Sequence, residues 1–453
     1  MIQTQQATLR EKLDGCFCLW MVFLALLYYI PFLMETVDIL LDISCVIGVG
    51  VIGLRLLARQ FQKTAYTWIL LAFLGLYALT AVLHGCRLDD AKVWIYLLLA
   101  FFLFFSAPKP QQAFITGKLM YLLTAYSLLT GIVSLILFLA DVTIIRGSAL
   151  TTDVAVVGIH PNSSLYGLIG NSNRMSWVAL FGIFASLYSM ELRSWGRAKY
   201  IFYGNIVLQV VLIVLSNSRG GALGLCIFVG FYSLVRALRK YKSLPRSLAV
   251  TLLALVLTVG SCAVIKHAEN LYYSHVIIPA EEASSPEQEH TSQLETAERG
   301  AEQQSRTTVA RLDAYRAGIQ VFLAHPLLGV GKEAVSEEMK HFLPKDSLLI
   351  SYQVTGNLHC TYLAVLVCSG LLGFGLLTAL VLRILLRTVK RRQQLSVREF
   401  LLLAVLLTFL AINLFESELL YVRTFSCFLC WYFLGLLAAR ETEDVLPESG
   451  DAS

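Results

Sequence analysis

Residues 361–382 read TYLAVLVCSGLLGFGLLTALVL and contain no charged side chain. A helix of about 20 apolar residues crosses a hydrocarbon core of about 30 Å, so this stretch is long enough to span a membrane. Lipid offers no partner to free backbone N–H and C=O groups, and the alternation typical of a β-barrel is absent, so we predict a helix. Eleven further stretches of this kind, the two shortest counted with their flanks, lie at 16–34, 38–54, 65–83, 93–106, 120–139, 175–190, 200–215, 221–236, 248–265, 399–415 and 424–439.

The composition excludes an ordinary soluble protein. Of the 453 residues, 57% are hydrophobic and 15% are charged, with a mean hydropathy of +0.67. A soluble chain carries roughly 25% charged residues. The ten cysteines show neither zinc-ligand spacing nor a secreted disulfide framework. We therefore predict an all-α polytopic membrane protein with about 12 transmembrane helices and one large outer loop that contains short amphipathic helices.

The cations predict the orientation, because Lys and Arg are enriched in the cytoplasmic loops of membrane proteins. With the N-terminus inside, the cytoplasmic cations are Arg10, Lys12, Arg55, Arg59, Lys63, Lys109, Lys118, Arg193, Arg197, Lys199, Arg236, Arg239, Lys240, Lys242, Arg246, Arg383, Arg387, Lys390, Arg391, Arg392, Arg398 and Arg440. The short outer loops hold only Arg87, Lys92, Arg146, Arg174, Arg219 and Arg423. This bias needs an even number of spans and places both termini in the cytoplasm. The expected organisation is transmembrane helices 1–9 in 1–265, an extracytoplasmic loop in 266–357, helices 10–12 in 358–440 and a cytoplasmic tail in 441–453.

The long outer loop has two distinct parts. Residues 281–305 are acidic and rich in Gln and Ser, which predicts a disordered or solvated insert. Residues 307–323 then predict an amphipathic helix, ended by His325-Pro326 and the glycines that follow, and a short helix is expected at 333–342. The apolar face of the first helix is expected to comprise Val309, Leu312, Tyr315, Ile319 and Phe322. A shorter outer segment, 141–173, is rich in Thr, Ser, Gly and Asn.

Several arginines are expected on the outer face. Arg219 follows an apolar stretch directly, and Arg174 follows Asn173. Arg311 lies one helical turn before Tyr315, which places a guanidinium beside an aromatic ring. A lone arginine of this kind more often reaches the headgroups, but several on one face could clamp a diphosphate, because guanidinium groups match phosphate oxygens in bidentate geometry. Arg316, spaced to pair with Asp313, is interpreted as structural.

His359 stands just before the 361–382 stretch. A histidine titrates near neutral pH and can accept a proton from a hydroxyl group. The spacing alone favours the simpler interpretation, a histidine that caps the helix. His325 and His341 compete for any proton-accepting role.

The carboxylates weigh against an ion-coupled pump, because none lies in the middle of a predicted span. Asp38, Asp42, Glu416 and Glu418 lie at outer helix ends and are interpreted as interfacial caps. No metal-ligand spacing joins the histidines, and no outer D-x-D pair is present. We therefore predict a mechanism with no metal and no cofactor.

Four short motifs together resemble the O-antigen ligase and O-antigen polymerase family of bacterial envelope glycosyltransferases. They are Gly170-Asn171-Ser172-Asn173, Ser218-Arg219-Gly220-Gly221, the segment from Arg311 through His325-Pro326 to Gly329-Val330-Gly331, and His359-Cys360-Thr361-Tyr362-Leu363 with Gly370 and Gly373. The resemblance covers roughly residues 165 to 380 and rests on the order and spacing of the motifs. Cys360 departs from it, because the family often has Asn there.

The resemblance implies a multi-pass protein of the bacterial cytoplasmic membrane with its active site on the outer face. The donor would be an undecaprenyl-diphosphate-linked oligosaccharide, and the acceptor a glycan or lipid-glycan hydroxyl. Arg219 and Arg311 would bind the diphosphate, and His359 would position or deprotonate the acceptor. Further substrate-binding residues would be Arg174, Asn173 and Tyr315. The lipid bilayer is the other expected partner, and no nucleic acid is expected.

Two other classes of function stay open. A multi-pass transporter of an anion or of a lipid-linked sugar would have the same topology, although the large Arg-containing outer loop favours an enzyme. A non-catalytic scaffold of an envelope assembly complex is the weaker alternative. Polymerase and ligase share donor and site and differ in the acceptor.

Overall fold

The computed structural model describes residues 8–58, 65–147, 154–160, 164–277, 293–345, 347–351 and 356–441. Within these residues each of the twelve predicted stretches overlaps a helix. These helices are α1 (Leu9–Leu27), α2 (Met34–Leu57), α3 (Ala65–Leu83), α4 (Leu88–Leu98) with the π-helix η1 (Leu99–Phe105), α5 (Lys109–Leu139), α6 (Ser172–Met190), α7 (Lys199–Leu215), α8 (Arg219–Tyr241), α9 (Leu244–Tyr272), α14 (Thr361–Lys390), α15 (Val397–Ile412) and α16 (Phe425–Glu441).

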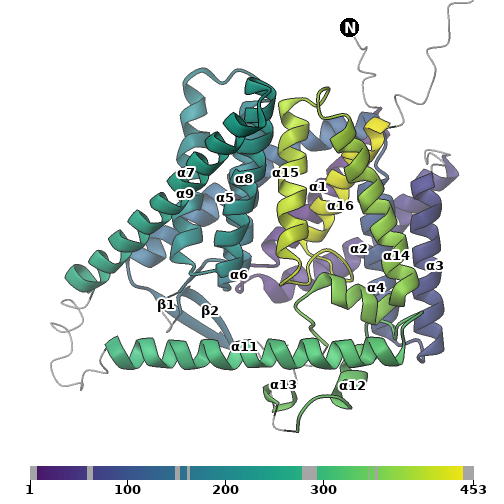
Figure 1. The fold of residues 1–453 in the computed structure, drawn as a ribbon. Helices are drawn as coiled ribbons and strands as arrows, with labels where there is room; N and C mark the ends of the chain where they lie inside the picture. The colour runs from purple at the N-terminus through teal and green to yellow at the C-terminus, as the bar shows by residue number, and fades with distance from the viewer. Residues whose placement is uncertain are drawn as a thin grey trace, which may run out of the picture.

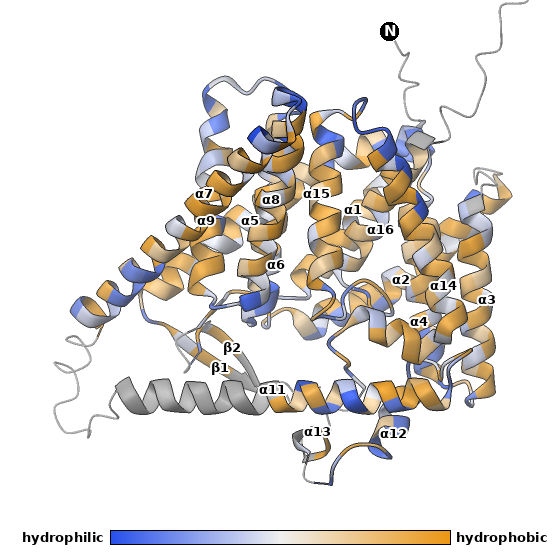
Figure 2. Cartoon of the chain, viewed as in Figure 1, coloured by the Kyte–Doolittle hydropathy of each residue, from blue (hydrophilic) through white to orange (hydrophobic). Residues whose placement is uncertain are grey.

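The described residues are 78% helical, which confirms the all-α prediction. By length and composition, seven helices in the described part of the chain could cross a membrane, beginning with Met34–Leu57 and ending with Thr361–Lys390. The count of twelve stays a prediction. Hydrophobic residues cover the lengths of the bundle helices, and hydrophilic residues gather near their ends (Figure 2). The first helix lies closer to the N-terminus than the predicted span 16–34. Helix α1 ends at Leu27, and residues 28–33 around Pro31 form turns.

Arg55 differs from the other cations assigned to the cytoplasm, because its side chain is completely buried. Its guanidinium donates to the carbonyl oxygens of Phe102 (3.2 Å) and Leu103 (3.1 Å) in η1 and pairs with Asp14 at 3.2 Å. A buried charge is tolerated only when it is paired and hydrogen-bonded. Arg55 therefore fastens α2 to the π-helix.

The segment 141–173, which follows α5, contains a small sheet that the sequence analysis did not predict. Strands β1 (Thr143–Gly147), β2 (Val154–Ile159) and β3 (Leu165–Gly167) pair antiparallel in the order β1-β2-β3. A Cβ atom at Gly158 (φ +94°) in β2 would lie far inside contact distance of the Val142 carbonyl oxygen, so this irregular position of the strand requires glycine. The sheet lies at the same end of the bundle as α11 (Figure 1).

In its described residues the long loop contains the end of α9, the π-helix η3 (Tyr273–Ile277) and the helices α11 (Gln293–Ala324), α12 (Ala334–Lys340) and α13 (Leu348–Ser351). Helix α11 lies across the end of the bundle, crosswise to the other helices (Figure 1). It begins at Gln293, so residues 293–305 are helical and not disordered, while the alternative of a solvated insert stays a prediction. Residues 281–292 of that insert, Arg59, Lys63 and the predicted tail from residue 442 onward lie outside the described residues.

The packing face of α11 also differs from the prediction. Val309, Leu312 and Ile319 are 46–52% exposed, whereas the small residues Ala314 and Ala317 are buried. Small side chains let the backbone of α11 approach the start of α14 closely. A Cβ atom at Gly318 would lie 2.6 Å from Leu358 Cδ2.

The turn after α11 is fixed to the middle of α14 by backbone hydrogen bonds. Val330 N donates to Val367 O (2.9 Å), and Leu371 N donates to Pro326 O (2.8 Å). The docking interrupts α14 at Gly370 (φ 60°, ψ −168°). A Cβ atom at Gly329 or Gly370 would lie 2.2–2.4 Å from a backbone oxygen, so these two glycines are needed for the close backbone contact.

Candidate functional site

Three helices begin at one place, beside the loop that joins α15 and α16. Asn171 caps α6 by accepting from Asn173 N (3.0 Å) and Arg174 N (3.1 Å), and Ser218 caps α8 by accepting from Gly221 N (3.1 Å). At the start of α14, Thr361 N donates to the Glu416 carbonyl oxygen (2.8 Å). The N-terminal end of a helix carries a partial positive charge and favours an anion.

The Glu416 carboxylate lies at this meeting point. Its Oε1 accepts from Asn173 Nδ2 (3.0 Å) and lies 3.8 Å from an Arg311 guanidinium nitrogen. Its Oε2 lies 4.0 Å from His359 Nδ1. Glu416 therefore brings together three predicted site residues that are far apart in the sequence, Asn173, Arg311 and His359. These three residues and Glu416 form the Glu416 cluster.

Glu416 is the site residue that the sequence analysis missed. It was interpreted as an interfacial cap, whereas the structure places it in the α15–α16 loop with a side chain only 16% exposed. The available signal was its side of the membrane, because the predicted outer ends of the last two spans face the same side as Arg219 and His359.

His359 has an unusual backbone, with φ at +45°. The left-handed region is uncommon for residues other than glycine. Here it is held by two hydrogen bonds, from His359 N to Asn357 Oδ1 (3.1 Å) and from the Tyr315 hydroxyl to His359 O (3.1 Å). The N-cap of α14 is Cys360, so His359 does not cap the helix.

The His359 ring keeps an unused nitrogen. Within the described residues, buried Nδ1 has no hydrogen-bond partner. A buried polar atom without a partner is costly, so such an atom is expected where a ligand completes the site. Tyr315 on α11 holds the His359 backbone carbonyl rather than the ring, and burial raises the pKa of the Tyr315 hydroxyl, which keeps it a donor.

Arg219 is connected to this cluster through its neighbour. Ser218 Oγ donates to Asn173 Oδ1 (2.9 Å), and Asn173 in turn donates to Glu416. The Arg219 side chain is exposed and makes no ion pair with any other described residue. It is therefore available to an anion from outside the chain.

Arg174 faces a second carboxylate. Its guanidinium lies 4.8 Å above the ring of Tyr29, whose hydroxyl donates to Glu418 (3.4 Å). Burial raises the pKa of Glu418, and the Arg174 charge lowers it in partial compensation. Arg174 thus follows directly after Asn173, which binds Glu416, but Arg174 itself forms no ion pair with Glu416.

One secondary expectation is corrected, and one competing histidine lies outside the cluster. Asp313 is buried and accepts from Ser347 Oγ (2.9 Å), so it does not form the expected pair with Arg316, which is exposed. His325 lies 3.9 Å from Glu338 and against the ring of His84, away from the Glu416 cluster. No group of three or more His, Cys, Asp or Glu side chains in the described ranges is arranged to hold a metal ion.

Comparison with known proteins identifies the region that carries the family resemblance. Residues 204–378 match a family model described as O-antigen ligase. The matched segment contains Arg219, Arg311 and His359 and excludes Asn173 and Glu416. No curated protein matches the chain. The match to residues 204–378 supports the O-antigen ligase family for this chain.

Proposed function

We propose that the protein is a membrane glycosyltransferase that moves a glycan from an undecaprenyl-diphosphate-linked donor to an acceptor hydroxyl. The observation that carries the proposal is the Glu416 cluster, in which Arg311, His359 and Asn173 meet beside three helix N-termini. A diphosphate is an anion, and this arrangement supplies guanidinium groups and the positive ends of three helix dipoles to attract one.

The proposed reaction is a single displacement. The acceptor oxygen attacks the anomeric carbon, the bond from that carbon to the diphosphate breaks with inversion, and undecaprenyl diphosphate leaves. Arg219 and Arg311 neutralise the leaving group as its negative charge develops. The acceptor proton passes to His359, whose Nδ1 lacks a protein partner and faces Glu416 at 4.0 Å.

Glu416 has two roles in this proposal. Before the donor arrives, its negative charge compensates the cationic surroundings. When the acceptor binds, the carboxylate stabilises the imidazolium that forms on His359. Tyr315 holds the His359 backbone, and Asn173 holds Glu416.

The location of the reaction is part of the proposal. We place the site on the outer face of the bacterial cytoplasmic membrane, with both termini in the cytoplasm, residues 266–357 as the extracytoplasmic loop and 358–440 as the last three spans. The donor on this face carries its own activated leaving group, so positioning and charge stabilisation suffice and we propose no metal ion. We favour polymerisation or general surface-glycan transfer over ligation to a lipid core.

The test uses the purified full chain with an undecaprenyl-diphosphate oligosaccharide, with and without a separate acceptor. A ladder of lengthened products supports a polymerase, and a single transferred block supports a ligase. Absence of product together with flux of the ligand in proteoliposomes would overturn the enzyme in favour of a transporter.

Variants test the assigned roles in the same assay. Arg219→Ala and Arg311→Ala are each expected to lower turnover by about 100-fold or more. This is the usual cost in other enzymes of removing one group that stabilises charge in the transition state. His359→Ala should reduce transfer steeply. Arg316→Ala, on the same helix as Arg311 but exposed and outside the cluster, is the matched control and should keep its activity. Full activity of both arginine variants would contradict the diphosphate site.

A further inference from the structure

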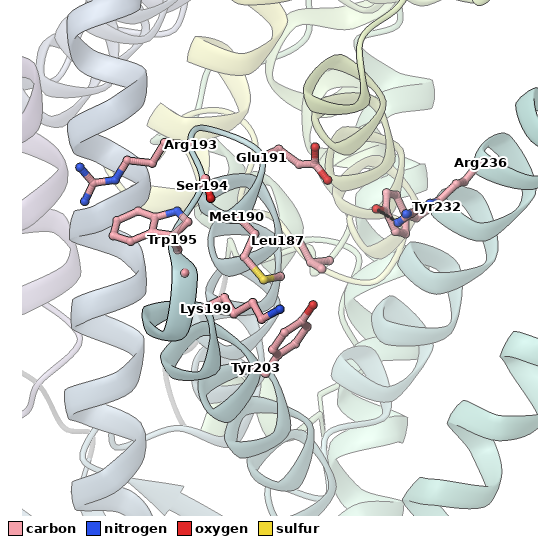
Figure 3. A pocket seen from close by; sticks show the side chains of 11 residues that line it. Leu187, Met190, Glu191, Arg193, Ser194, Trp195, Lys199, Tyr203, Tyr232 and Arg236 are labelled. Atoms are coloured by element: carbon pink, nitrogen blue, oxygen red, sulfur yellow. Dashed lines mark hydrogen bonds between the residues drawn. The ribbon is translucent and has the colours of Figure 1, made fainter.

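A cavity of about 470 Å³ opens at the other end of the bundle from Glu416. It lies between the end of α6, the α6–α7 connection with the short 3-10 helix η2 (Gly196–Ala198), the start of α7 and the second half of α8. Because α6 and α8 begin at the Glu416 cluster, their far ends lie on the face that the cation distribution assigns to the cytoplasm. Figure 3 shows the side chains around this space.

The lining of the cavity is cationic and aromatic. It contains Arg193, Lys199 and Arg236 against the single carboxylate of Glu191. Lys199 and Tyr203 project from α7 on one side, and Tyr232 and Arg236 belong to α8 on the other (Figure 3).

The cations are held by aromatic rings and a hydroxyl. Arg236 donates to the Tyr232 hydroxyl (2.9 Å), and the Arg193 guanidinium lies 3.9 Å above the Trp195 ring. Within the described residues, no carboxylate forms an ion pair with Arg193, Lys199 or Arg236. The side chains are therefore positioned while their charge stays available.

The helices that frame the cavity expose apolar side chains beyond it. Ile201 (57% exposed) and Val207 (64% exposed) lie along α7, and Phe231 (39% exposed) lies on α8. Both helices are long and apolar enough to cross a membrane. A ligand with a phosphate at one end and apolar chains at the other therefore matches both the cavity and its flanks.

We propose that this cavity binds the phosphate headgroup of an anionic phospholipid, with the acyl chains along α7 and α8. Guanidinium and ammonium groups bind phosphate oxygens strongly, and basic pockets between membrane helices are a recurrent site for anionic headgroups. The exposed apolar flanks favour a lipid over a free phosphate. The site is separate from the Glu416 cluster and does not depend on the function proposed for it.

The test compares two double variants of the full chain purified in detergent. Lys199→Ala with Arg236→Ala removes the cavity cations. Arg197→Ala with Lys240→Ala removes two exposed cations of the same face that do not line the cavity. Phosphatidylglycerol should raise the unfolding temperature of the unmodified protein and of the control variant, because a ligand that binds the native state stabilises it. Native mass spectrometry should show retention of this lipid by the cavity variant that is weaker by about 10-fold or more.

Each other outcome counts against the proposal. Equal loss of lipid in both double variants would mean attraction to general surface charge. Equal stabilisation by phosphatidylcholine would remove the requirement for an anionic headgroup. Inorganic phosphate alone, if it reproduced the full stabilisation, would overturn the lipid as the occupant.

Discussion

Glu416 is the residue on which the proposed chemistry depends most directly. Glu416→Gln keeps the size of the side chain and an oxygen that accepts from Asn173, but it removes the charge that faces Arg311 and His359. We expect the transfer rate to fall by about 100-fold, the lower range for loss of acid–base support. The unfolding temperature should change little. Product formation from the lipid-linked donor is the measurement.

A matched control for that change is Glu337→Gln on α12, at the same end of the protein. Glu337 is exposed and pairs with Arg87, and exposed pairs contribute little to stability. Its rate should equal that of the unmodified protein. If Glu416→Gln were as active as Glu337→Gln, the carboxylate would have no part in catalysis.

Glu418 predicts a pH dependence of stability. Burial raises its pKa in the folded protein above the ordinary value of about 4.3. The folded state therefore holds this proton more tightly than the unfolded state. The corresponding stability is complete below the ordinary pKa and is lost as pH rises through the folded pKa. The unfolding temperature should therefore decline as pH rises from the ordinary pKa through the folded pKa, and Glu418→Gln should abolish this decline. The same decline of the unfolding temperature in the variant would assign it to another group.

Single residues could be predicted from the sequence where the residue type was unusual for its surroundings. Arg219 and His359 are polar groups at the predicted outer ends of apolar stretches, and Arg311 lies on the predicted amphipathic helix of the outer loop. Glu416 had the same placement, but its partners Asn173, Arg311 and His359 come from three other elements. Only the folded arrangement distinguishes a carboxylate that joins such elements from one that caps a helix.

At the scale of elements, the contact between α11 and α14 positions His359. Gly318 on α11 leaves room for Leu358, which precedes His359 directly. Gly318→Leu should push Leu358 away and reduce transfer by about 10-fold or more, since a misplacement of about 1 Å can cost 100-fold. Adding Leu358→Ala makes space again and should restore part of the rate. Gln320→Leu, which adds the same side chain at an exposed position of α11, should have no effect.

The outcome that would contradict this role of α11 is full activity of Gly318→Leu. A loss that Leu358→Ala fails to restore would assign the defect to folding of α11 rather than to the contact. Unfolding temperatures of the three variants separate the two cases.

Elements were predictable to different degrees for physical reasons. Each apolar stretch overlaps a helix, because a long uncharged run in lipid must satisfy its backbone hydrogen bonds internally, as a helix does. The sheet β1-β2-β3 was missed, since its strands have three to six residues and lie in a polar segment. The face of α11 was misjudged because close packing selected Ala314 and Ala317, while larger apolar residues such as Leu312 stayed exposed.

For the whole molecule, the cation distribution predicts that the site and both termini lie on opposite sides of the membrane. In the structure, α1 begins and α16 ends on the side of the bundle opposite to α11 (Figure 1). This arrangement agrees with an even number of crossings. The charge pattern gives the orientation in a membrane, which a structure of the chain alone does not contain.

Cys86 provides a native reporter of this orientation. It is an exposed thiol in the α3–α4 connection, next to Arg87, which pairs with Glu337 on α12. A membrane-impermeant maleimide should therefore label Cys86 in intact cells from outside, and Cys86→Ser should remove that signal.

In the Cys86→Ser background, Lys340→Cys on α12 should be labelled in intact cells. Lys242→Cys, at the turn between α8 and α9, should be labelled only after the membrane is permeabilised. Labelling of Lys242→Cys in intact cells would invert the orientation and place the Glu416 cluster in the cytoplasm, where the proposed outer-leaflet reaction has no place.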